Sequence, residues 1–287
     1  MVIVYSPRCL EYEAPGHPER PARVRETAAL LQQHGHEWHT PVACTDGQLL
    51  RVHRHRQLDA VRTGDYEDAD TPHFRQMNEL ARLAAGAAVQ AAKAAVAGRP
   101  AFSLMRPPGH HACRDRVMGF CYFNNIAVAV AELLAEMRLD RVAILDFDCH
   151  HGNGTEDIFR GEDRVRFVSL HQSPCYPGTG LATQQNCFNY PLPPGTESAE
   201  FLATLQRALE TVAAFEPEVL AVSAGFDMFR KDPITDMALE VETFGAAGRL
   251  IGQWSGPTFA VLEGGYAEEL PQCIHAFLTG WESANGR

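Results

Sequence analysis

The sequence predicts an α/β protein of one domain, in which a central, mostly parallel sheet is flanked by helices. Short apolar runs alternate along the chain with longer helical patterns, and this alternation is typical of a doubly wound sheet. Four of the loops that carry glycine, proline and histidine directly follow an apolar run. Because open α/β sheets bind ligands beyond the carboxyl ends of their strands, the same pattern indicates where a functional site lies.

Six apolar runs are the expected strands of this sheet. They are continuous rather than alternating, as expected for parallel strands that are covered on both faces. The runs span residues 2–5, 101–105, 142–147, 165–170, 219–223 and 258–262.

Helices are expected between these strands. Residues 77–97 are rich in alanine, the strongest helix former, and Gly98 and Pro100 end the pattern. The other helices are expected at residues 125–138, 198–215, 239–254 and 268–278. A chain of 287 residues can bury one large core, so we expect a single domain over residues 1–287.

The composition is that of an ordinary globular protein, with 45% hydrophobic and 21% charged residues. The formal net charge of −11 argues against a protein that binds nucleic acid through phosphate contacts, and it suits a cationic substrate. The eight cysteines form no CxxC pair, and no basic leader precedes an apolar segment. No apolar stretch approaches the ~20 residues of a membrane span. We therefore expect a cytoplasmic protein with reduced thiols and no membrane partner, whose oligomeric state stays open.

A cluster of carboxylates and imidazoles lies at the end of the third apolar run, in DFDCHHGNGT (residues 146–155). Side chains two residues apart on a strand point to one side, so Asp146, Asp148 and His150 share a face as the strand ends. Like charges stacked at a buried strand end need a compensating cation.

A third ligand for such a cation has to come from elsewhere in the chain. Asp227, in SAGFD (residues 223–227), follows another strand and is the obvious choice, although a lone aspartate there is more often a turn or capping residue. Three protein ligands with an open position form a catalytic zinc site. Two carboxylates nearly cancel the charge of a divalent cation, so the site also needs a base and a second electrophile.

Two adjacent histidines are the candidates for the base. His110 and His111 follow a Pro-Pro-Gly turn in RPPGHHA (residues 106–112). A histidine base usually has an orienting partner, and Asp146 and Asn153 are both available. An asparagine partner orients an imidazole without stabilising its protonated form, so that histidine would be the better base near pH 7.

The candidate electrophile is a tyrosine at the end of the last strand. LEGGY (residues 262–266) contains two glycines that permit a sharp turn, and Tyr266 can then project its hydroxyl inward. A phenol that donates to a developing oxyanion complements a metal ion in amide hydrolysis.

In this order, the motifs RPPGHHA, GFCYFNN (residues 119–125), DFDCHHGNGT, SAGFD and LEGGY resemble those of the zinc-dependent histone deacetylase family. That family includes bacterial histone-deacetylase-like amidohydrolases and acetylpolyamine amidohydrolases. The resemblance extends from about residue 15 to residue 266 and implies an arginase-like α/β fold with one catalytic zinc ion per chain. It implies hydrolysis of an N-acyl amide, with release of acetate and a free amine. The expected substrate is the side chain of N-acyl-lysine in a peptide or protein, and the alternative is an acetylated polyamine.

The resemblance also implies a role for each matching residue. The implied zinc ligands are Asp148, His150 and Asp227. The implied catalytic residues are the base His111 with its partner Asn153, the second histidine His110 with its partner Asp146, and Tyr266, which stabilises the oxyanion. The implied substrate-binding residues are Gly119, Phe120 and Tyr176 around the channel, Arg23 in an inner acetate channel, Asp70 at the rim and Ile234 at the gate.

Family members further carry structural potassium near the zinc, which the resemblance extends to this chain. The implied potassium ligands are Asp146 and Asp148, main-chain oxygens around His150 and Leu170, and the Ser169 hydroxyl. A second potassium is implied near Phe159 and Val165.

Three positions bear on which branch of the family the chain resembles. Asn153 and Glu263 are similar to the class II side. Polyamine-selective relatives carry a glutamate after an Asp-Pro pair, whereas Ile234 follows Asp232 and Pro233 here. An apolar gate offers no charge to a secondary ammonium, so this position favours acyl-lysine. The acidic residues within 65–70 are an argument for a cationic substrate, although a solvated loop is the simpler interpretation.

Two other functions fit parts of the pattern. An arginase-like dimanganese hydrolase would need carboxylate pairs for two metal ions, and this chain has ligands for one. A non-catalytic acyl-lysine-binding module would have lost Tyr266, a histidine or a metal ligand, and none is lost. Ferrous iron remains an alternative to zinc in the same site.

Overall fold

A computed structural model describes residues 1–284 and confirms the predicted fold class. Eight strands form one sheet in the order β2-β1-β3-β8-β7-β4-β5-β6, and every neighbouring pair is parallel. The strands are β1 (Val2–Val4), β2 (Glu37–His39), β3 (Ala101–Ser103), β4 (Val142–Asp146), β5 (Val165–Gln172), β6 (Cys187–Leu192), β7 (Val219–Ala224) and β8 (Thr258–Leu262).

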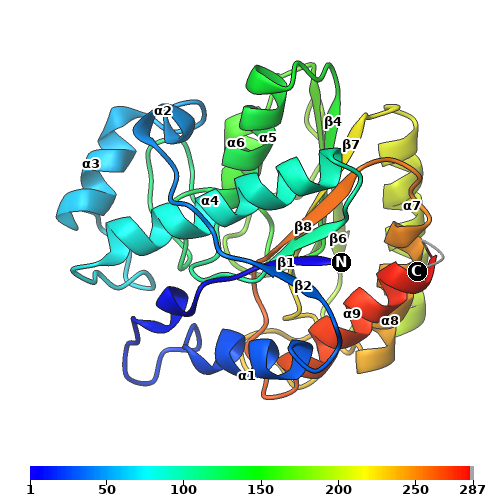
Figure 1. Ribbon diagram of the computed structural model, residues 1–287. Helices are drawn as coiled ribbons and strands as arrows, with labels where there is room; N and C mark the ends of the chain where they lie inside the picture. The colour runs from blue at the N-terminus through cyan, green and yellow to red at the C-terminus, as the bar shows by residue number, and fades with distance from the viewer. Residues whose placement is uncertain (285–287) are drawn as a thin grey trace.

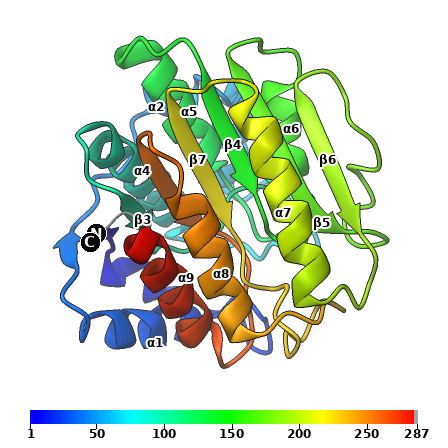
Figure 2. The same ribbon diagram turned by 90° about the vertical axis from the view of Figure 1, so that its right-hand side faces the viewer.

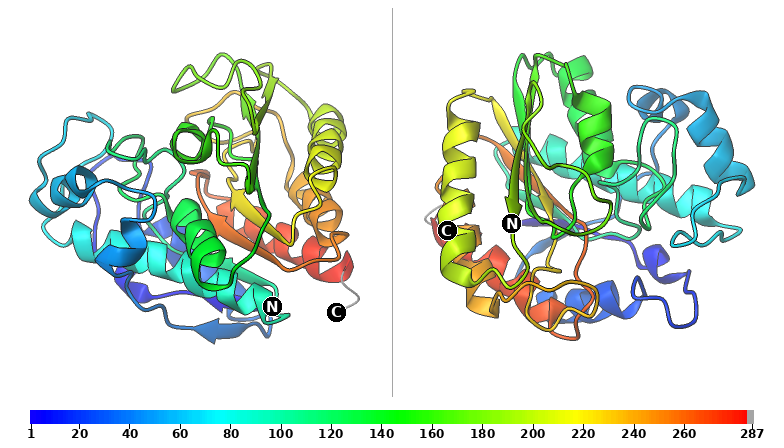
Figure 3. Two further views of the ribbon diagram at one scale, coloured as in Figure 1. Left: turned by 90° about the horizontal axis from the view of Figure 1, so that it is seen from above. Right: turned by 180° about the vertical axis from the view of Figure 1, so that it is seen from behind.

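Helices cover both faces of this sheet. Figure 2 shows α7, α8 and α9 in front of β7 and β4, and the view from above places α4 and α5 on the opposite face (Figure 3). The shorter α2 and α3 lie outside α4, away from the sheet (Figure 1). The helices are η1 (Pro7–Leu10), α1 (Ala22–Leu31), α2 (Asp46–Leu49), α3 (His55–Thr63), α4 (Met77–Val96), α5 (Asn125–Glu136), α6 (Asn153–Phe159), α7 (Ser198–Ala213), α8 (Val241–Gly252) and α9 (Leu270–Ala284).

The predicted strands and helices are all present, and the additional strands lie at the two edges of the sheet. The burial of β6 is interrupted by the exposed Pro191, and β2 has no buried residue, so neither has a continuous apolar run. An edge strand packs on fewer neighbours, which removes the signal that identifies the central strands. One hydrophobic cluster connects both layers of helices to the sheet. A single domain over residues 1–287 stays a prediction, because residues 285–287 lie outside the described part.

Parallel pairing brings the carboxyl ends of all strands to one edge of the sheet. The long segments after β3, β4, β7 and β8 therefore meet there, and they carry most of the motifs singled out in the sequence. No helix within residues 1–284 combines the length and the apolar character needed to span a membrane. The cytoplasmic location stays a prediction.

A buried histidine holds the segment between β3 and α5 in place. The Nδ1 of His53 lies 2.9 Å from the carbonyl oxygen of Cys113, and its Nε2 accepts a hydrogen bond of 2.9 Å from the main-chain nitrogen of Asn124. The two bonds require a neutral imidazole with its proton on Nδ1. Burial accordingly lowers the pKa of His53 to about 4.

We expect acid to destabilise the fold through His53. Its pKa is lower in the folded than in the unfolded chain, so its contribution is complete above about pH 6.5 and declines as the pH falls towards 4. Between pH 7 and pH 5 this residue should remove roughly 2 kcal/mol from the free energy of unfolding. Urea denaturation at both pH values checks it, with His53→Gln as the comparison. The variant should be less stable at pH 7 but lose less on acidification; an equal loss in both proteins would contradict the assignment.

Candidate active site

A cavity of about 330 Å³ opens at the carboxyl edge of the sheet. It is lined by residues of the segments that follow β3, β4, β5, β7 and β8, together with His17, Pro18 and Asp70. The residues around it are His17, Pro18, Asp70, Pro108, His110, His111, Gly119, Phe120, His150, Tyr176, Ile234, Gly264 and Tyr266. Most of the residues singled out in the sequence thus lie around one cavity.

At the base of the cavity, two carboxylates and an imidazole converge. Ligand atoms of Asp148, His150 and Asp227 all lie within 4.8 Å of one another, and all three residues are buried. The Nδ1 of His150 lies 2.9 Å from Asp227 Oδ2 and 3.2 Å from Asp148 Oδ1. Segments that are 77 residues apart in sequence are joined here because β4 and β7 are neighbours in the sheet.

The surroundings of this triad fit a divalent metal ion. The main-chain nitrogens of Cys149 and Gly264 donate to Asp227 and Asp148, at 2.8 and 2.7 Å, and keep both carboxylates in position. A side chain at Gly264 would collide with both carboxylates, so glycine is required there. Two carboxylates and one imidazole with an open side match the donor set of catalytic zinc sites. Within residues 1–284, this is the one cluster of metal-ligating side chains with such spacing.

His111 is oriented by an amide. Its Nδ1 lies 2.7 Å from Asn153 Oδ1, and the amide nitrogen of Asn153 points to the sulfur atoms of Met118 and Cys113. The asparagine oxygen therefore accepts the Nδ1 proton and leaves Nε2 free as a base. Burial, followed by repulsion from His110 and His150, lowers the pKa of His111 well below its ordinary value.

His110 has the opposite electrostatic environment. Its Nδ1 lies 3.0 Å from Asp146 Oδ2, and its Nε2 lies 3.7 Å from Asp148 Oδ1. Burial works against the protonated ring, but the carboxylates of Asp148 and Asp146 outweigh burial and raise the pKa of His110 to about 10. The two adjacent histidines thus differ in charge near neutral pH.

Glu263 holds the turn that carries both histidines. It is fully buried, and its Oε2 accepts hydrogen bonds from the main-chain nitrogens of Gly109 and His110, at 2.7 and 3.1 Å. Its Oε1 accepts another from the Ser223 hydroxyl at 3.1 Å. In the sequence, Glu263 was noted only as a residue similar to the class II side of the family. Its position next to the double glycine carried no indication that it reaches across to the histidine turn.

Asp232 and Arg23 hold the main chain and the ring of Tyr266 in position. Its main-chain nitrogen donates to Asp232 Oδ2 at 2.7 Å, and the guanidinium carbon of Arg23 lies 4.6 Å from its ring centroid. Arg23 does not line the cavity; its guanidinium binds Glu19 and the carbonyl oxygens of Glu263 and Gly265. Burial raises the pKa of Tyr266 well above its ordinary value, so its hydroxyl remains a donor.

One wall of the cavity is a strained turn at Gly119 and Phe120. Both have left-handed backbone conformations, with φ of 57° and 68°, and an aromatic residue adopts this conformation only at a cost. A Cβ at Gly119 would also collide with the ring of His111. Backbone strain of this kind persists only where neighbouring groups support the turn.

Asp68 and Thr71 supply this support. The sequence analysis considered Asp68 only as one of the acidic residues within 65–70, and it did not identify Thr71. Thr71 donates its hydroxyl proton to Asp68 Oδ2 at 2.5 Å, and the same hydroxyl accepts a hydrogen bond of 2.9 Å from the nitrogen of Phe120. Asp68 Oδ2 also accepts from the nitrogen of Gly119 at 3.2 Å. No motif signal could have identified them, because the contacts join loops about 50 residues apart.

The mouth of the cavity contains the remaining expected residues. Tyr176 and Ile234 are 39% and 37% exposed, so they form its outer edge. The carbonyl oxygen of Asp70 lies 3.1 Å from Nε2 of His17, a cavity residue that was not singled out. His17 also packs edge-on against Phe120, with ring centroids 4.6 Å apart.

The expected potassium ligands lie on the neighbouring strands β4 and β5 and in the metal cluster itself. Asp146 pairs in register with Ser169 of β5, and Leu170 follows it. The Ser169 hydroxyl lies 2.9 Å from Nδ1 of His171. Phe159 and Val165 are both buried, and the side-chain amide of Asn186 donates hydrogen bonds to their carbonyl oxygens.

Comparison with known proteins now identifies this arrangement. A model of the histone deacetylase domain matches residues 17–281. The chain belongs to the histone deacetylase family. It is 36% identical to the histone deacetylase-like amidohydrolase of Pseudomonas aeruginosa, over 91% of this chain and 75% of that protein. It is 40% identical to an acetylpolyamine amidohydrolase of Burkholderia pseudomallei, over 76% of this chain and 67% of that protein.

The same fold is found in a solved structure. The crystal structure of the HDA15 HD domain superposes with a TM-score of 0.91 at 32% identity, covering 100% of this chain and 91% of that one. The arginase-like α/β fold expected from the motifs is therefore confirmed, as is a deacetylase of the amidohydrolase type. Zinc dependence is characteristic of this family, and the buried Asp-His-Asp triad is present. The relatives include both protein-type and polyamine-type names, so the family alone does not define the substrate.

Proposed function

We propose that this histone deacetylase-family enzyme hydrolyses the side-chain amide of N-acyl-lysine in peptides or proteins. The observation that carries this proposal is the apolar mouth of the cavity. Phe120, Tyr176 and Ile234 all line this cavity, and Ile234 offers no charge to a secondary ammonium. Such an entrance accommodates a long alkyl stem whose charge has been removed by acylation.

The proposed roles follow from the contacts of each side chain. Asp148, His150 and Asp227 would hold zinc, which when bound polarises the acyl carbonyl and acidifies water. His111 takes a proton from the attacking water at Nε2, because Asn153 occupies its Nδ1.

Two further groups complete the reaction. Tyr266 donates its hydroxyl to the oxyanion, because its raised pKa keeps it protonated. One of the two histidines then protonates the leaving amine. His110, whose pKa is raised to about 10, carries a proton at neutral pH and is positioned by Asp146.

We further propose a structural potassium ion between β4 and β5. Asp146 and Asp148 are fully buried, and Asp146 pairs in register with Ser169, which is followed by Leu170. A monovalent cation there would offset two buried carboxylates without competing for zinc. The second potassium ion, near Phe159 and Val165, stays a prediction.

A substrate panel tests the main proposal. Metal-replete enzyme is assayed on acetyl-lysine peptides, acetylputrescine and acetylspermidine, and catalytic efficiencies are compared. We expect peptides to be preferred by at least about tenfold. A preference for the acetylated polyamines would replace the proposal with its alternative. Tight peptide binding without turnover would indicate a non-catalytic binding module, and two metal ions per chain would indicate a dimanganese hydrolase.

Replacing Ile234 at the mouth of the cavity should alter the preference for acetyl-lysine peptides over acetylated polyamines. In Ile234→Glu, a carboxylate at the partly exposed mouth would attract the secondary ammonium of an acetylated polyamine. We expect catalytic efficiency on acetylspermidine to rise by roughly fivefold, which is the size of a partly screened charge interaction. The matched control is Ile234→Gln, which has similar size and no charge. An equal gain in both variants would show that charge is not the cause.

Thr71 should stabilise the turn at Gly119 and Phe120, which forms one wall of the cavity, without taking part in the reaction. Thr71→Val keeps the shape of the side chain but leaves the nitrogen of Phe120 without its acceptor. Leaving a donor unpaired costs about 1–3 kcal/mol, so we expect the wall to relax and KM for an acetyl-lysine peptide to rise about tenfold. Steady-state kinetics measures the effect, with kcat changing less than KM. Thr71→Ser, which retains the hydroxyl, should restore KM; failure to do so would exclude the hydrogen bond as the cause.

A further inference from the structure

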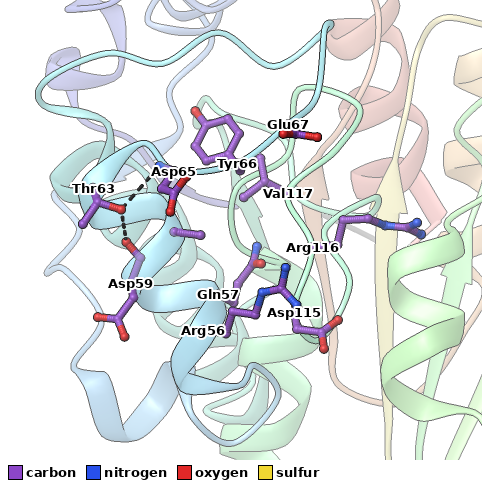
Figure 4. A pocket seen from close by; sticks show the side chains of 11 residues that line it. Arg56, Gln57, Asp59, Thr63, Asp65, Tyr66, Glu67, Asp115, Arg116 and Val117 are labelled. Atoms are coloured by element: carbon purple, nitrogen blue, oxygen red, sulfur yellow. Dashed lines mark hydrogen bonds between the residues drawn. The ribbon is translucent and has the colours of Figure 1, made fainter.

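One wall of the active-site cavity is supported from the loop that follows α3. The same loop borders a second cavity of about 750 Å³, where the Thr63 hydroxyl donates to the carbonyl oxygen of Asp59 at 2.8 Å and accepts from the nitrogen of Asp65 at 3.3 Å (Figure 4). The side chains around this second cavity carry charges of both signs, and none of them is a catalytic or metal-binding residue. Another wall of the active-site cavity, which includes Tyr266 and Ile234, has a separate support.

Asp232 is the support of this wall. The residue is 7% exposed and is not among those that line the cavity. Its Oδ2 accepts a hydrogen bond of 2.7 Å from the main-chain nitrogen of Tyr266, and its Oδ1 accepts one of 3.1 Å from the main-chain nitrogen of Ile234. One buried carboxylate thus holds both the residue proposed to stabilise the oxyanion and the apolar residue at the mouth of the cavity.

The peptide unit between Gly265 and Tyr266 is held at both ends. Its carbonyl oxygen accepts a hydrogen bond of 2.5 Å from Nε of Arg23, and its N–H group is the donor to Asp232. Gly265 has a φ of 117°, which glycine adopts readily, and a glycine leaves the neighbouring peptide plane free to turn. Without the acceptor at Asp232 this plane would be held only by Arg23, and its rotation would displace the side chain of Tyr266.

A carboxylate is the side chain that can hold both nitrogens. Both of its oxygens accept hydrogen bonds, whereas the amide of an asparagine has one acceptor and would place its NH2 group against the other main-chain N–H. An asparagine in place of Asp232 could therefore hold Tyr266 or Ile234, but not both. Burial raises the pKa of Asp232 to about 7, so the carboxylate is ionised above about pH 8.

We propose that Asp232 is a positioning residue that couples the catalytic tyrosine to the mouth of the cavity. This inference rests on the proposed function, in which Tyr266 stabilises the oxyanion and Ile234 favours acyl-lysine. Asp232 itself touches neither the substrate nor the reacting atoms. It acts on kcat through the peptide unit before Tyr266, and on substrate preference through the main chain of Ile234.

Asp232→Asn, assayed above about pH 8, tests the proposal. We expect kcat for an acetyl-lysine peptide to fall by about 10- to 100-fold, because a small displacement of a catalytic group costs this much. The preference for the peptide over acetylspermidine should fall by about fivefold, since an unpaired main-chain donor releases Ile234. Metal content should equal that of the parent enzyme. Asp236→Asn, at an exposed aspartate of the same segment, is the matched control and should change neither quantity.

Two double-mutant cycles locate these effects. In a Tyr266→Phe background the hydroxyl is already absent, so Asp232→Asn should lower kcat by less than about twofold. In an Ile234→Ala background most of the apolar side chain is already absent, so Asp232→Asn should leave the substrate preference unchanged. A residue that only stabilised the fold would change both quantities by the same factor in every background. If a thermal melt shows that Asp232→Asn is unfolded, Asp232→Ser, which retains one acceptor and has no NH2 group, enters the same cycles.

The outcomes separate this inference from the proposed function. Equal losses of kcat in the parent and the Tyr266→Phe backgrounds would overturn the inference alone, as would loss of the metal ion from Asp232→Asn. Unchanged kcat and preference in Asp232→Asn would also overturn it, while peptide turnover by the parent enzyme leaves the proposed function standing. If the parent enzyme prefers acetylspermidine, the proposed substrate is wrong, and the Tyr266→Phe cycle run on acetylspermidine still decides whether Asp232 positions the tyrosine.

Discussion

Asp148→Asn is expected to remove both the metal ion and the activity. Asp148 contributes one of the two carboxylates that face Nδ1 of His150, and a neutral amide is a poor ligand for zinc. We expect metal content to fall from about one per chain to less than about 0.1. Deacylation should fall by roughly 10⁴-fold or more, because carbonyl polarisation and water activation are lost together.

Elemental analysis and peptide deacylation measure this prediction on the same purified samples. Asp163→Asn is the matched control, because Asp163 is an exposed aspartate outside the cavity. It should retain full metal content and activity. Normal turnover in Asp148→Asn after its metal has been removed would contradict the proposed site.

The second large effect is expected at the two residues that act on the reacting atoms without holding the metal. His111→Ala removes the proposed base, and Tyr266→Phe removes the proposed oxyanion donor. Each should lower kcat by about 10²–10⁴-fold while metal content stays the same as in the parent enzyme. KM should change little, because neither group contributes strongly to binding the alkyl stem.

The measurement combines steady-state kinetics with metal analysis for both variants. Tyr176→Phe is a useful comparison, since it removes a phenol hydroxyl at the mouth of the cavity rather than at its base. It should leave kcat within about threefold of the parent value. Unchanged turnover in His111→Ala would refute the role of that residue, and a loss of metal in either variant would assign it to the metal site instead.

Much of the fold was predictable because its strongest signals are local. The central strands are buried on both faces and therefore form continuous apolar runs, and the alanine-rich stretch of α4 has few alternatives to a helix. The edge strands β2 and β6 lack such runs, and the four-residue α2 is too short for a periodic pattern. Their positions depend on neighbours that are distant in sequence.

The candidate site likewise contains residues that the sequence identified and residues that only the structure revealed. Metal-ligating and catalytic residue types stand in compact motifs after strands, so the sequence alone identified Asp148, His150 and Asp227 as a set. The supporting groups are single residues without a motif. Thr71 and Asp68 act only through the main chain of Gly119 and Phe120, and Glu263 acts only through the histidine turn.

By itself, the sequence determined the α/β class of this protein, its membership of a metal-dependent amidohydrolase family and the residues that meet at the carboxyl edge of the sheet. These follow from hydrophobic periodicity and from side-chain chemistry concentrated in short motifs. Only the tertiary structure decided how the strained Phe120 turn is supported and that Glu263 holds the turn that carries the two histidines. Those properties depend on burial and on hydrogen bonds between distant segments, and neither is encoded in any local pattern.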